Sequence, residues 1–259
     1  MNILVFVKRV PDTESRVRVS SDGMRIVEEG LNFIISPYDE YAVEEALRLR
    51  ESKGGRVTAI SVGPEEALRI LRKCLAMGAD EALLVKDKTP ETFDGLRTAT
   101  AIASLVRTKF PDFDLLLFGK QSFGADNGQV PAMVAELLHV PQVNVVVRLQ
   151  VEGKEGVAFR EVEGAQEKVT FPLPAVVSAQ KGLNEPRYET LKGIMAAKRK
   201  EIPVIPIEEI VPAAKLGSGV EVVKIEPPPA KQAGRIIQLP PEEAAREIVR
   251  FLREEAKVL

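Results

Sequence analysis

Residues 56–85 read RVTAISVGPEEALRILRKCLAMGADEALLV, and this stretch decides the fold. It opens with a short apolar run at 56–62 and closes with another at 81–85. Between them, residues 64–77 place apolar side chains at three- and four-residue spacing, which is typical of an amphipathic helix. Pro64 suits the helix start, and Gly78 suits its end. This order predicts two parallel strands joined by a right-handed helical crossover.

The same alternation continues on both sides of this unit. Apolar runs at 2–8 (NILVFVK) and 114–119 (DLLLFG) predict two more strands, and their unbroken apolar character indicates burial on both faces. Residues 38–53 and 92–108 repeat the helical spacing and predict the remaining crossovers. We therefore expect an α/β fold with a doubly wound, mostly parallel sheet of the Rossmann-like kind, in the strand order 3-2-1-4.

The remaining segments add to this core. Residues 20–31 have the pattern of a hairpin, and residues 142–151, 156–162, 167–173 and 175–179 predict added edge strands, which we expect to be antiparallel. From residue 201 the chain is rich in proline, and residues 241–257 then form an amphipathic helical pattern. We therefore divide the chain into a domain at 1–200 and an extended carboxyl-terminal arm at 201–259 that packs on a partner subunit.

Composition argues against several classes of protein. The 259 residues include 36 basic and 38 acidic ones, and a formal charge of −2 gives no overall field that attracts nucleic acid or an anionic membrane. No stretch reaches the roughly 20 apolar residues that span a bilayer. We expect a cytoplasmic protein, which the single cysteine, Cys74, also fits. One cysteine and one histidine, His139, make no metal-ligand spacing, so we expect neither a metal site nor catalytic residues.

The expected sheet has a natural place for a ligand. In doubly wound sheets the crevice forms at the carboxyl ends of the strands where the strand order reverses. The first strand runs into KRVPD at 8–12, and the fourth runs into GKQSFGADNGQ at 119–129. The glycines allow close backbone approach, and the helix expected at 129–138 begins with free amides that suit a phosphate. Because the loop lacks GxGxxG and P-loop motifs, a plain turn between strand and helix is the alternative interpretation.

Residues 183–200, LNEPRYETLKGIMAAKRK, place apolar side chains among positive charges. Asn184 and Pro186 disfavour regular structure, and we expect a short helix from Gly193 onward with Leu191 on the loop before it. An exposed leucine among these charges would suit an acidic partner with an apolar pocket. The alternative is a buried Leu191 surrounded by solvated lysines.

This segment resembles the partner-recognition loop of the electron-transfer flavoprotein β subunit. The resemblance extends over nearly the whole chain, through VKRVPD at 7–12, AVEEALRLRE, LAMGADEALLV and LLLFGKQSFGADNGQ. It implies an adenine-nucleotide-binding type of the predicted fold. It also implies an electron carrier, not an enzyme, that works as a heterodimer with an α subunit.

The resemblance further implies one FAD, held mostly by the α subunit, and one structural AMP held by this chain. Tyr38 and Thr13, in the turn at 11–13, would form a wall against the flavin. The docking residues for the partner would be Arg187, Leu191, Ile194, Met195, Lys198, Arg199 and Lys200. The AMP contacts would be Phe6, Ser36, Pro37, Tyr38, Asp39, Val62, Gly119, Lys120, Gln121, Ser122, Phe123, Gly124, Ala125, Asp126, Asn127, Gly128, Gln129 and Val130.

The implied partners are flavoprotein dehydrogenases, such as the acyl-CoA dehydrogenases of fatty acid oxidation, which donate electrons, and a quinone-linked oxidoreductase, which accepts them. One alternative is an electron-bifurcating complex in which a second FAD replaces AMP. Another is a homodimeric nucleotide-binding module, which would explain the sheet and the crevice but would give no function to the basic segment and the arm. The chain departs from the family pattern at Ser36 and at Gly124 and Ala125, so the resemblance defines the location of the nucleotide loops but not their geometry. It also departs at Lys192, Ala196 and Arg199, which leaves the identity of the partner open.

Overall fold

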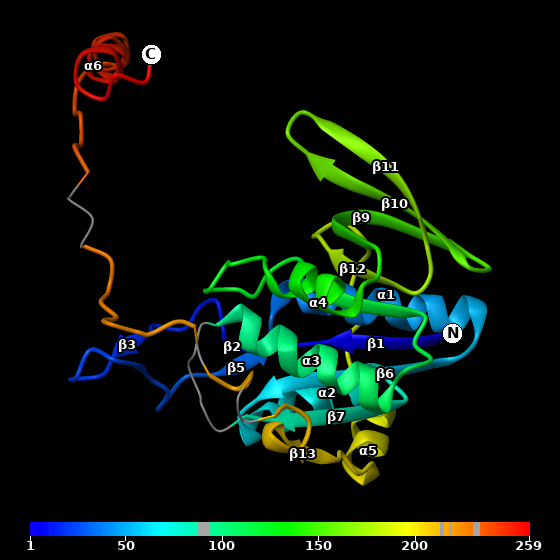
Figure 1. The fold of residues 1–259 in the computed structure, drawn as a ribbon. Helices are drawn as coiled ribbons and strands as arrows, with labels where there is room; N and C mark the ends of the chain where they lie inside the picture. The colour runs from blue at the N-terminus through cyan, green and yellow to red at the C-terminus, as the bar shows by residue number, and fades with distance from the viewer. Residues whose placement is uncertain (88–93, 213–214, 218, 230–233) are drawn as a thin grey trace. The chain divides into compact units, whose positions relative to one another are not determined.

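The structure is a computed structural model of the 259-residue chain, and it describes residues 1–87, 94–212, 215–217, 219–229 and 234–259. These residues form two compact units, Met1–Ile225 and Glu226–Leu259. At the centre of the first unit, the described residues form a sheet of nine strands with helices on both faces (Figure 1).

Four parallel strands form the middle of this sheet. They are β1 (Asn2–Phe6), β6 (Arg56–Gly63), β7 (Glu81–Lys86) and β8 (Leu115–Gly119), and they lie in the order β8-β1-β6-β7. The pairs β8–β1, β1–β6 and β6–β7 are all parallel. The predicted order 3-2-1-4 is therefore confirmed, and the order reverses between β1 and β8.

The crossover helices cover the two faces of the sheet in pairs. The helices α1 (Pro37–Lys53) and α2 (Leu68–Met77) pack in one apolar core, which includes Leu47 and Leu71. The helices α3 (Gly95–Lys109) and α4 (Val130–Leu138) pack in the other, which includes Leu105 and Val134. The helix predicted at 64–77 begins with a 3-10 turn, η1 (Glu65–Ala67), while residues 92 and 93 of the helix predicted at 92–108 lie outside the described residues.

The added strands differ in part from the prediction. The strands β9 (Gln142–Glu152), β10 (Glu155–Val162) and β11 (Ala165–Pro172) form an antiparallel meander, as expected. The strand β12 (Ala175–Ala179) instead lies between β8 and β9 and is parallel to both, so the antiparallel prediction was wrong for this strand. Its sequence, AVVSA, is buried at every position, as expected for a strand covered on both faces.

Short strands complete the first unit. The strand β13 (Val204–Pro206) extends the sheet beside β7 and leads into η2 (Ile207–Glu209). Near the amino terminus, β2 (Arg9–Pro11) pairs with β5 (Phe33–Ile35). Between them, β3 (Arg18–Val19) and β4 (Ile26–Val27) pair antiparallel, which confirms the predicted hairpin.

The second unit contains the helix α6 (Pro241–Glu254), near the predicted bounds. None of the residues of α6 is buried, and Ile248 and Val249 expose an apolar stripe. Among the described residues, no helix is both long enough and apolar enough to cross a membrane.

The helix α5 (Leu191–Arg199) packs closely on α2 because it contains a glycine at the contact. A Cβ atom on Gly193 would overlap the backbone carbonyl oxygen of Ala76, near the end of α2. Since that carbonyl belongs to a buried residue, it has little freedom to move away.

We expect Gly193→Ala to destabilise the protein by about 1–3 kcal/mol, because the added methyl group overpacks this contact. In an ordinary helix interior the same change stabilises by up to about 1 kcal/mol, so the expected sign is reversed. Urea unfolding followed by circular dichroism measures the difference. An increase in the free energy of unfolding would contradict the close packing of α5 on α2.

Candidate functional site: a crevice at the strand-order reversal

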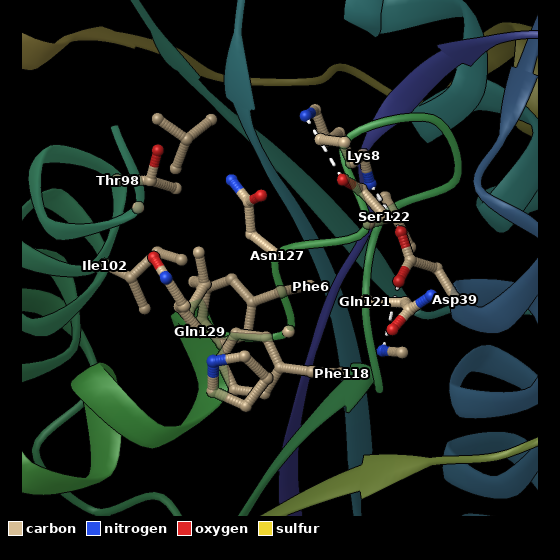
Figure 2. A pocket seen from close by; sticks show the side chains of 18 of the residues that line it. Phe6, Lys8, Asp39, Thr98, Ile102, Phe118, Gln121, Ser122, Asn127 and Gln129 are labelled. Atoms are coloured by element: carbon tan, nitrogen blue, oxygen red, sulfur yellow. Dashed lines mark hydrogen bonds between the residues drawn. The ribbon is translucent and has the colours of Figure 1, made fainter. Parts of the chain in front are cut away.

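A cavity lies at the carboxyl ends of the parallel strands, where the strand order reverses (Figure 2). Its apolar side is built by Phe6 of β1 and Phe118 of β8, whose rings stack with centroids 4.6 Å apart. Ile60 and Ile102 extend this apolar surface. The polar side comes from Lys8, from the loop between β8 and α4, and from the start of α3. A flat apolar surface opposite polar groups suits a ligand with an aromatic base and a phosphate.

The buried carboxylate of Asp39 connects the two strands that flank the cavity. Its Oδ2 atom accepts a hydrogen bond from the Lys8 amide at 2.8 Å, and its Oδ1 atom accepts one from the Gly119 amide at 3.0 Å (Figure 2). A Cβ atom on Gly119 would overlap Asp39 Oδ1, so this strand end requires glycine. One side chain at the start of α1 therefore fixes the ends of β1 and β8.

Burial raises the pKa of Asp39 to about 7, while the two backbone amides and the nearby Lys8 ammonium act in the opposite direction. The group therefore changes its protonation state near neutral pH. Both oxygens accept amide hydrogen bonds, so this carboxyl group holds the backbone at the ends of β1 and β8.

The loop between β8 and α4 has a backbone shape that depends on left-handed residues. Gly124, Asp126 and Gly128 have φ angles of 93°, 50° and 61°. The Asp126 carboxylate accepts a hydrogen bond from the Gln121 side-chain amide at 2.8 Å, which supports its own unusual conformation. The loop thus follows a defined path around the cavity.

Polar contacts hold the loop against the rest of the site. The Phe123 amide donates to Ser36 Oγ at 3.3 Å. Lys8 Nζ donates to Ser122 Oγ at 3.4 Å (Figure 2). Within the described part of the chain, no side chain caps α4 at its first residues, where Gln129 precedes Val130. A helix start without a side-chain cap, close to a lysine, suits an anionic group.

The cavity brings together many of the residues predicted to contact AMP, but not all of them. Three of the predicted residues, Ser36, Tyr38 and Lys120, do not line the cavity. Ser36 accepts from the Phe123 amide of the loop, and the Lys120 ammonium lies 4.8 Å from the centre of the Tyr38 ring. Pro37, Phe123, Gly124 and Asp126 also lie outside the cavity lining. The predicted residues that line it are Phe6, Asp39, Val62, Gly119, Gln121, Ser122, Ala125, Asn127, Gly128, Gln129 and Val130.

Sequence reasoning missed the contribution of α3. Asp94, Gly95 and Thr98 line the cavity, and the Asp94 carboxylate caps α3 by accepting from the amides of Leu96 and Arg97. The signal available in the sequence was an Asp-Gly pair at a helix start that follows the third parallel strand. Ile60, Ile102 and Phe118 were also missed, while Lys8 belongs to the segment 8–12 that we expected at the crevice but was not among the predicted AMP contacts.

The two residues predicted to face a flavin lie on connected elements. Tyr38 is the second residue of α1, and Thr13 lies exposed in the turn after β2. The Ser36 amide donates to the Lys8 carbonyl at 2.9 Å, which joins the approach to α1 with the approach to β2.

The predicted docking segment, residues 183–200 and called the docking segment below, exposes apolar side chains at its surface. Leu191 is 84% exposed, Met195 is 57% exposed and Tyr188 is 92% exposed, so the alternative of a buried Leu191 is wrong. Leu191 is the first residue of α5, whereas we predicted a loop position. The reason is a helix cap that we missed: the Thr190 hydroxyl accepts from the Gly193 amide at 3.0 Å.

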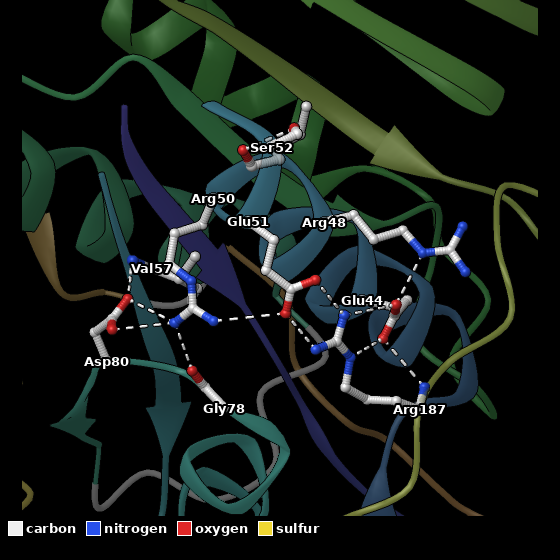
Figure 3. Close-up of polar contacts among 10 residues, drawn as sticks. Glu44, Arg48, Arg50, Glu51, Ser52, Val57, Gly78, Asp80 and Arg187 are labelled. Atoms are coloured by element: carbon white, nitrogen blue, oxygen red, sulfur yellow. Dashed lines mark hydrogen bonds and ion pairs between the residues drawn. The ribbon is translucent and has the colours of Figure 1, made fainter. Parts of the chain in front are cut away.

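Ion pairs fix the docking segment to α1 (Figure 3). The Arg187 guanidinium bonds Glu44 at 2.8 Å and Glu51 at 3.0 Å, and these carboxylates raise its pKa. The Asn184 side chain donates to Glu45 at 2.9 Å and to the Tyr41 carbonyl at 3.0 Å. Arg187 therefore holds the segment in place, while Lys198, Arg199 and Lys200 are exposed at its end.

Among the described residues, no group of three or more histidine, cysteine, aspartate or glutamate side chains is arranged to hold a metal ion. Cys74 is buried, and burial raises the pKa of its thiol to about 12.

The fold and the crevice define a doubly wound α/β protein with a cavity at its strand-order reversal. Comparison with known proteins is more specific. The profile of the Electron transfer flavoprotein domain matches residues 23–210. Relatives named electron transfer flavoprotein subunit beta include proteins of Bacillus subtilis (39% identical, 100% of both chains), Thermoanaerobacterium thermosaccharolyticum (38%, covering 97% of this chain and 98% of the relative) and Mus musculus (36%, covering 100% and 99%).

The chain belongs to the electron-transfer flavoprotein family, and it matches the β subunits of that family over its full length. Membership assigns it an electron-transfer role in a flavoprotein. The designation β also implies pairing with an α subunit.

We expect Asp39→Asn to lower the free energy of unfolding by about 1–3 kcal/mol, because an amide presents a donor to one of the two backbone amides. The pKa of Asp39 rises from 3.8 to about 7 on folding, so its proton stabilises the folded state below pH ~4, and this contribution declines as the pH rises toward 7. The advantage of the natural protein should therefore be larger at pH ~5 than at pH ~8. Urea unfolding at both pH values checks this, and an equal difference would contradict the assignment.

Proposed function

We propose that this chain is the β subunit of a heterodimeric electron carrier that accepts electrons from flavoprotein dehydrogenases, such as acyl-CoA dehydrogenases. The electrons pass through one FAD, held mostly by the α subunit, to a quinone-linked oxidoreductase. The observation that carries the proposal is the docking segment. Its exposed Leu191 stands on a base that Arg187, Glu44 and Glu51 fix to the body of the protein.

An exposed leucine on a fixed base suits a transient redox encounter. The apolar side chain supplies an anchor without an ordering cost for the segment that carries it. The surrounding lysine and arginine side chains steer an acidic partner and speed association. A small contact of this kind also permits fast release, which a carrier that serves several donors needs.

The crevice supports a second part of the proposal, a bound AMP. The stacked rings of Phe6 and Phe118 would contact the base, and the loop amides with Lys8 would hold the phosphate. The Asp39 carboxylate, which would otherwise repel a phosphate, is occupied by the amides of Lys8 and Gly119. Since a ligand of the folded state alone raises stability, AMP acts as a structural element.

The flavin itself would supply the redox chemistry, and this chain would shape one side of its environment. Tyr38 would contribute an aromatic face and Thr13 a polar one. The Lys120 ammonium above the Tyr38 ring limits the motion of that ring. The apolar stripe of α6, which none of the described contacts buries, would pack on the α subunit and thereby keep the two chains together.

We expect acid extraction of the purified heterodimer to release one FAD and one AMP per complex, because the crevice of this chain is assigned to AMP. Chromatography of the extract with absorbance detection counts both. Two flavins and no AMP per complex would instead favour the electron-bifurcating alternative.

We expect Leu191→Ala to raise the apparent KM for the donor dehydrogenase by about tenfold or more, as for the loss of a binding hot spot. The FAD content should stay unchanged, because Leu191 is exposed and is not part of the proposed flavin wall, Tyr38 and Thr13. Steady-state reduction of the heterodimer by a reduced acyl-CoA dehydrogenase measures the effect.

The matched control is Leu96→Ala, which removes a leucine that is 54% exposed on α3. This variant should keep the KM of the natural protein. Unchanged donor kinetics in Leu191→Ala would contradict the docking assignment.

A further inference from the structure

A second hollow lies beside the docking segment, between β5, α2 and α5, with a cavity volume of about 500 Å³. Phe33 of β5, Leu68 of α2 and both Ile194 and Ala197 of α5 line it with apolar groups. Ile194, predicted as a docking residue, is half-buried here, unlike the exposed Leu191. The hollow is therefore an apolar groove, with α5 as one wall.

The rim of this groove is strongly positive. Arg69 and Lys198 are exposed on opposite walls, α2 and α5. Arg72 and Lys73 also line the groove, although Lys73 pairs with Glu40 at 2.7 Å and Arg72 donates to the carbonyls of Ala197 and Lys200. One carboxylate, that of Glu189, lines it. An occupant should therefore combine an apolar side chain with negative charge.

The groove is continuous with the docking surface through α5. Leu191 and Met195 lie one helical turn apart on the outer side of α5, while Ile194 and Ala197 face the groove from the adjacent side. Lys198 lies at the groove and is also part of the docking segment. A partner that covers Leu191 can thus reach the groove across a single helix.

We propose that this groove is a second docking subsite, which receives an apolar side chain flanked by carboxylates from the electron-donating dehydrogenase. The inference rests on the proposed function and extends it. Leu191 inserts into the partner, and a side chain of the partner inserts into the groove. Two anchors on one rigid helix fix the rotation of the partner, which a single leucine leaves free. The basic rim adds electrostatic steering toward the same orientation.

The test uses the purified heterodimer with its FAD and a reduced acyl-CoA dehydrogenase as donor. Arg69→Glu reverses one rim charge outside the docking segment, and Leu68→Glu places a carboxylate in the groove wall. We expect each to raise the apparent KM about fivefold or more at low ionic strength, with kcat unchanged. Arg69→Glu should also weaken the dependence of KM on salt.

The matched control is Lys109→Glu, which makes the same charge reversal on α3, on the opposite face of the sheet. Gel filtration and flavin absorbance verify that each variant is a loaded heterodimer. An equal effect of Lys109→Glu, or normal kinetics in both groove variants, would overturn the groove proposal. Loss of the α subunit from the groove variants would overturn it as well, because the α subunit would then be the occupant.

The Leu191→Ala variant separates this proposal from the one on which it rests. If Leu191→Ala weakens the donor interaction and the groove variants do not, the docking segment stands and only the groove fails. If Leu191→Ala has no effect either, the proposed docking function itself fails.

Discussion

The carboxylate of Asp39 is the contact on which the site depends. It accepts hydrogen bonds from the backbone amides at the ends of β1 and β8, and the amide of Gly119 would otherwise be buried without a partner. Burying a carboxylate is costly, and the rise of its pKa to about 7 records that cost. In exchange, the two strands that flank the strand-order reversal keep a fixed spacing, and Gly119 leaves room for the contact. The crevice therefore depends on three residues, namely Asp39 and the two residues whose amides it binds, Lys8 and Gly119.

The helix α1 carries this constraint to the docking surface. Its first turn holds Asp39, its middle holds Glu44 and Glu45, and its last turns hold Glu51 and Arg50. Arg50 donates to the Gly78 carbonyl at 2.7 Å and pairs with Asp80 at 3.0 Å, which joins α1 to the start of β7 (Figure 3). Crevice and docking segment are therefore both attached to one helix, the crevice through Asp39 and the docking segment through Glu44, Glu45 and Glu51.

The fold was predictable because unbroken apolar runs and right-handed crossovers leave few topologies open. The parallel insertion of β12 between β8 and β9 could not be predicted, because the run AVVSA indicates a buried strand but not which strands it pairs with. The family resemblance placed Asp39 among the expected AMP contacts, and nothing in the sequence indicated that it joins two strands. Its partners, Lys8 and Gly119, lie 31 and 80 residues away, so its task emerges only when the strands assemble. Similarly, the sequence does not show that the start of α3 lines the crevice, because that contact forms only when the helix packs on the sheet.

The proposed adenine nucleotide lies in the crevice between β1 and β8 and leaves the proposed docking segment free for partners. Amide hydrogen exchange of the heterodimer, followed by mass spectrometry with AMP removed and then restored, tests this placement most directly. We predict that AMP slows exchange in peptides covering residues 119–130 and leaves residues 183–200 unchanged. Protection confined to other segments, or no protection at residues 119–130, would contradict the account.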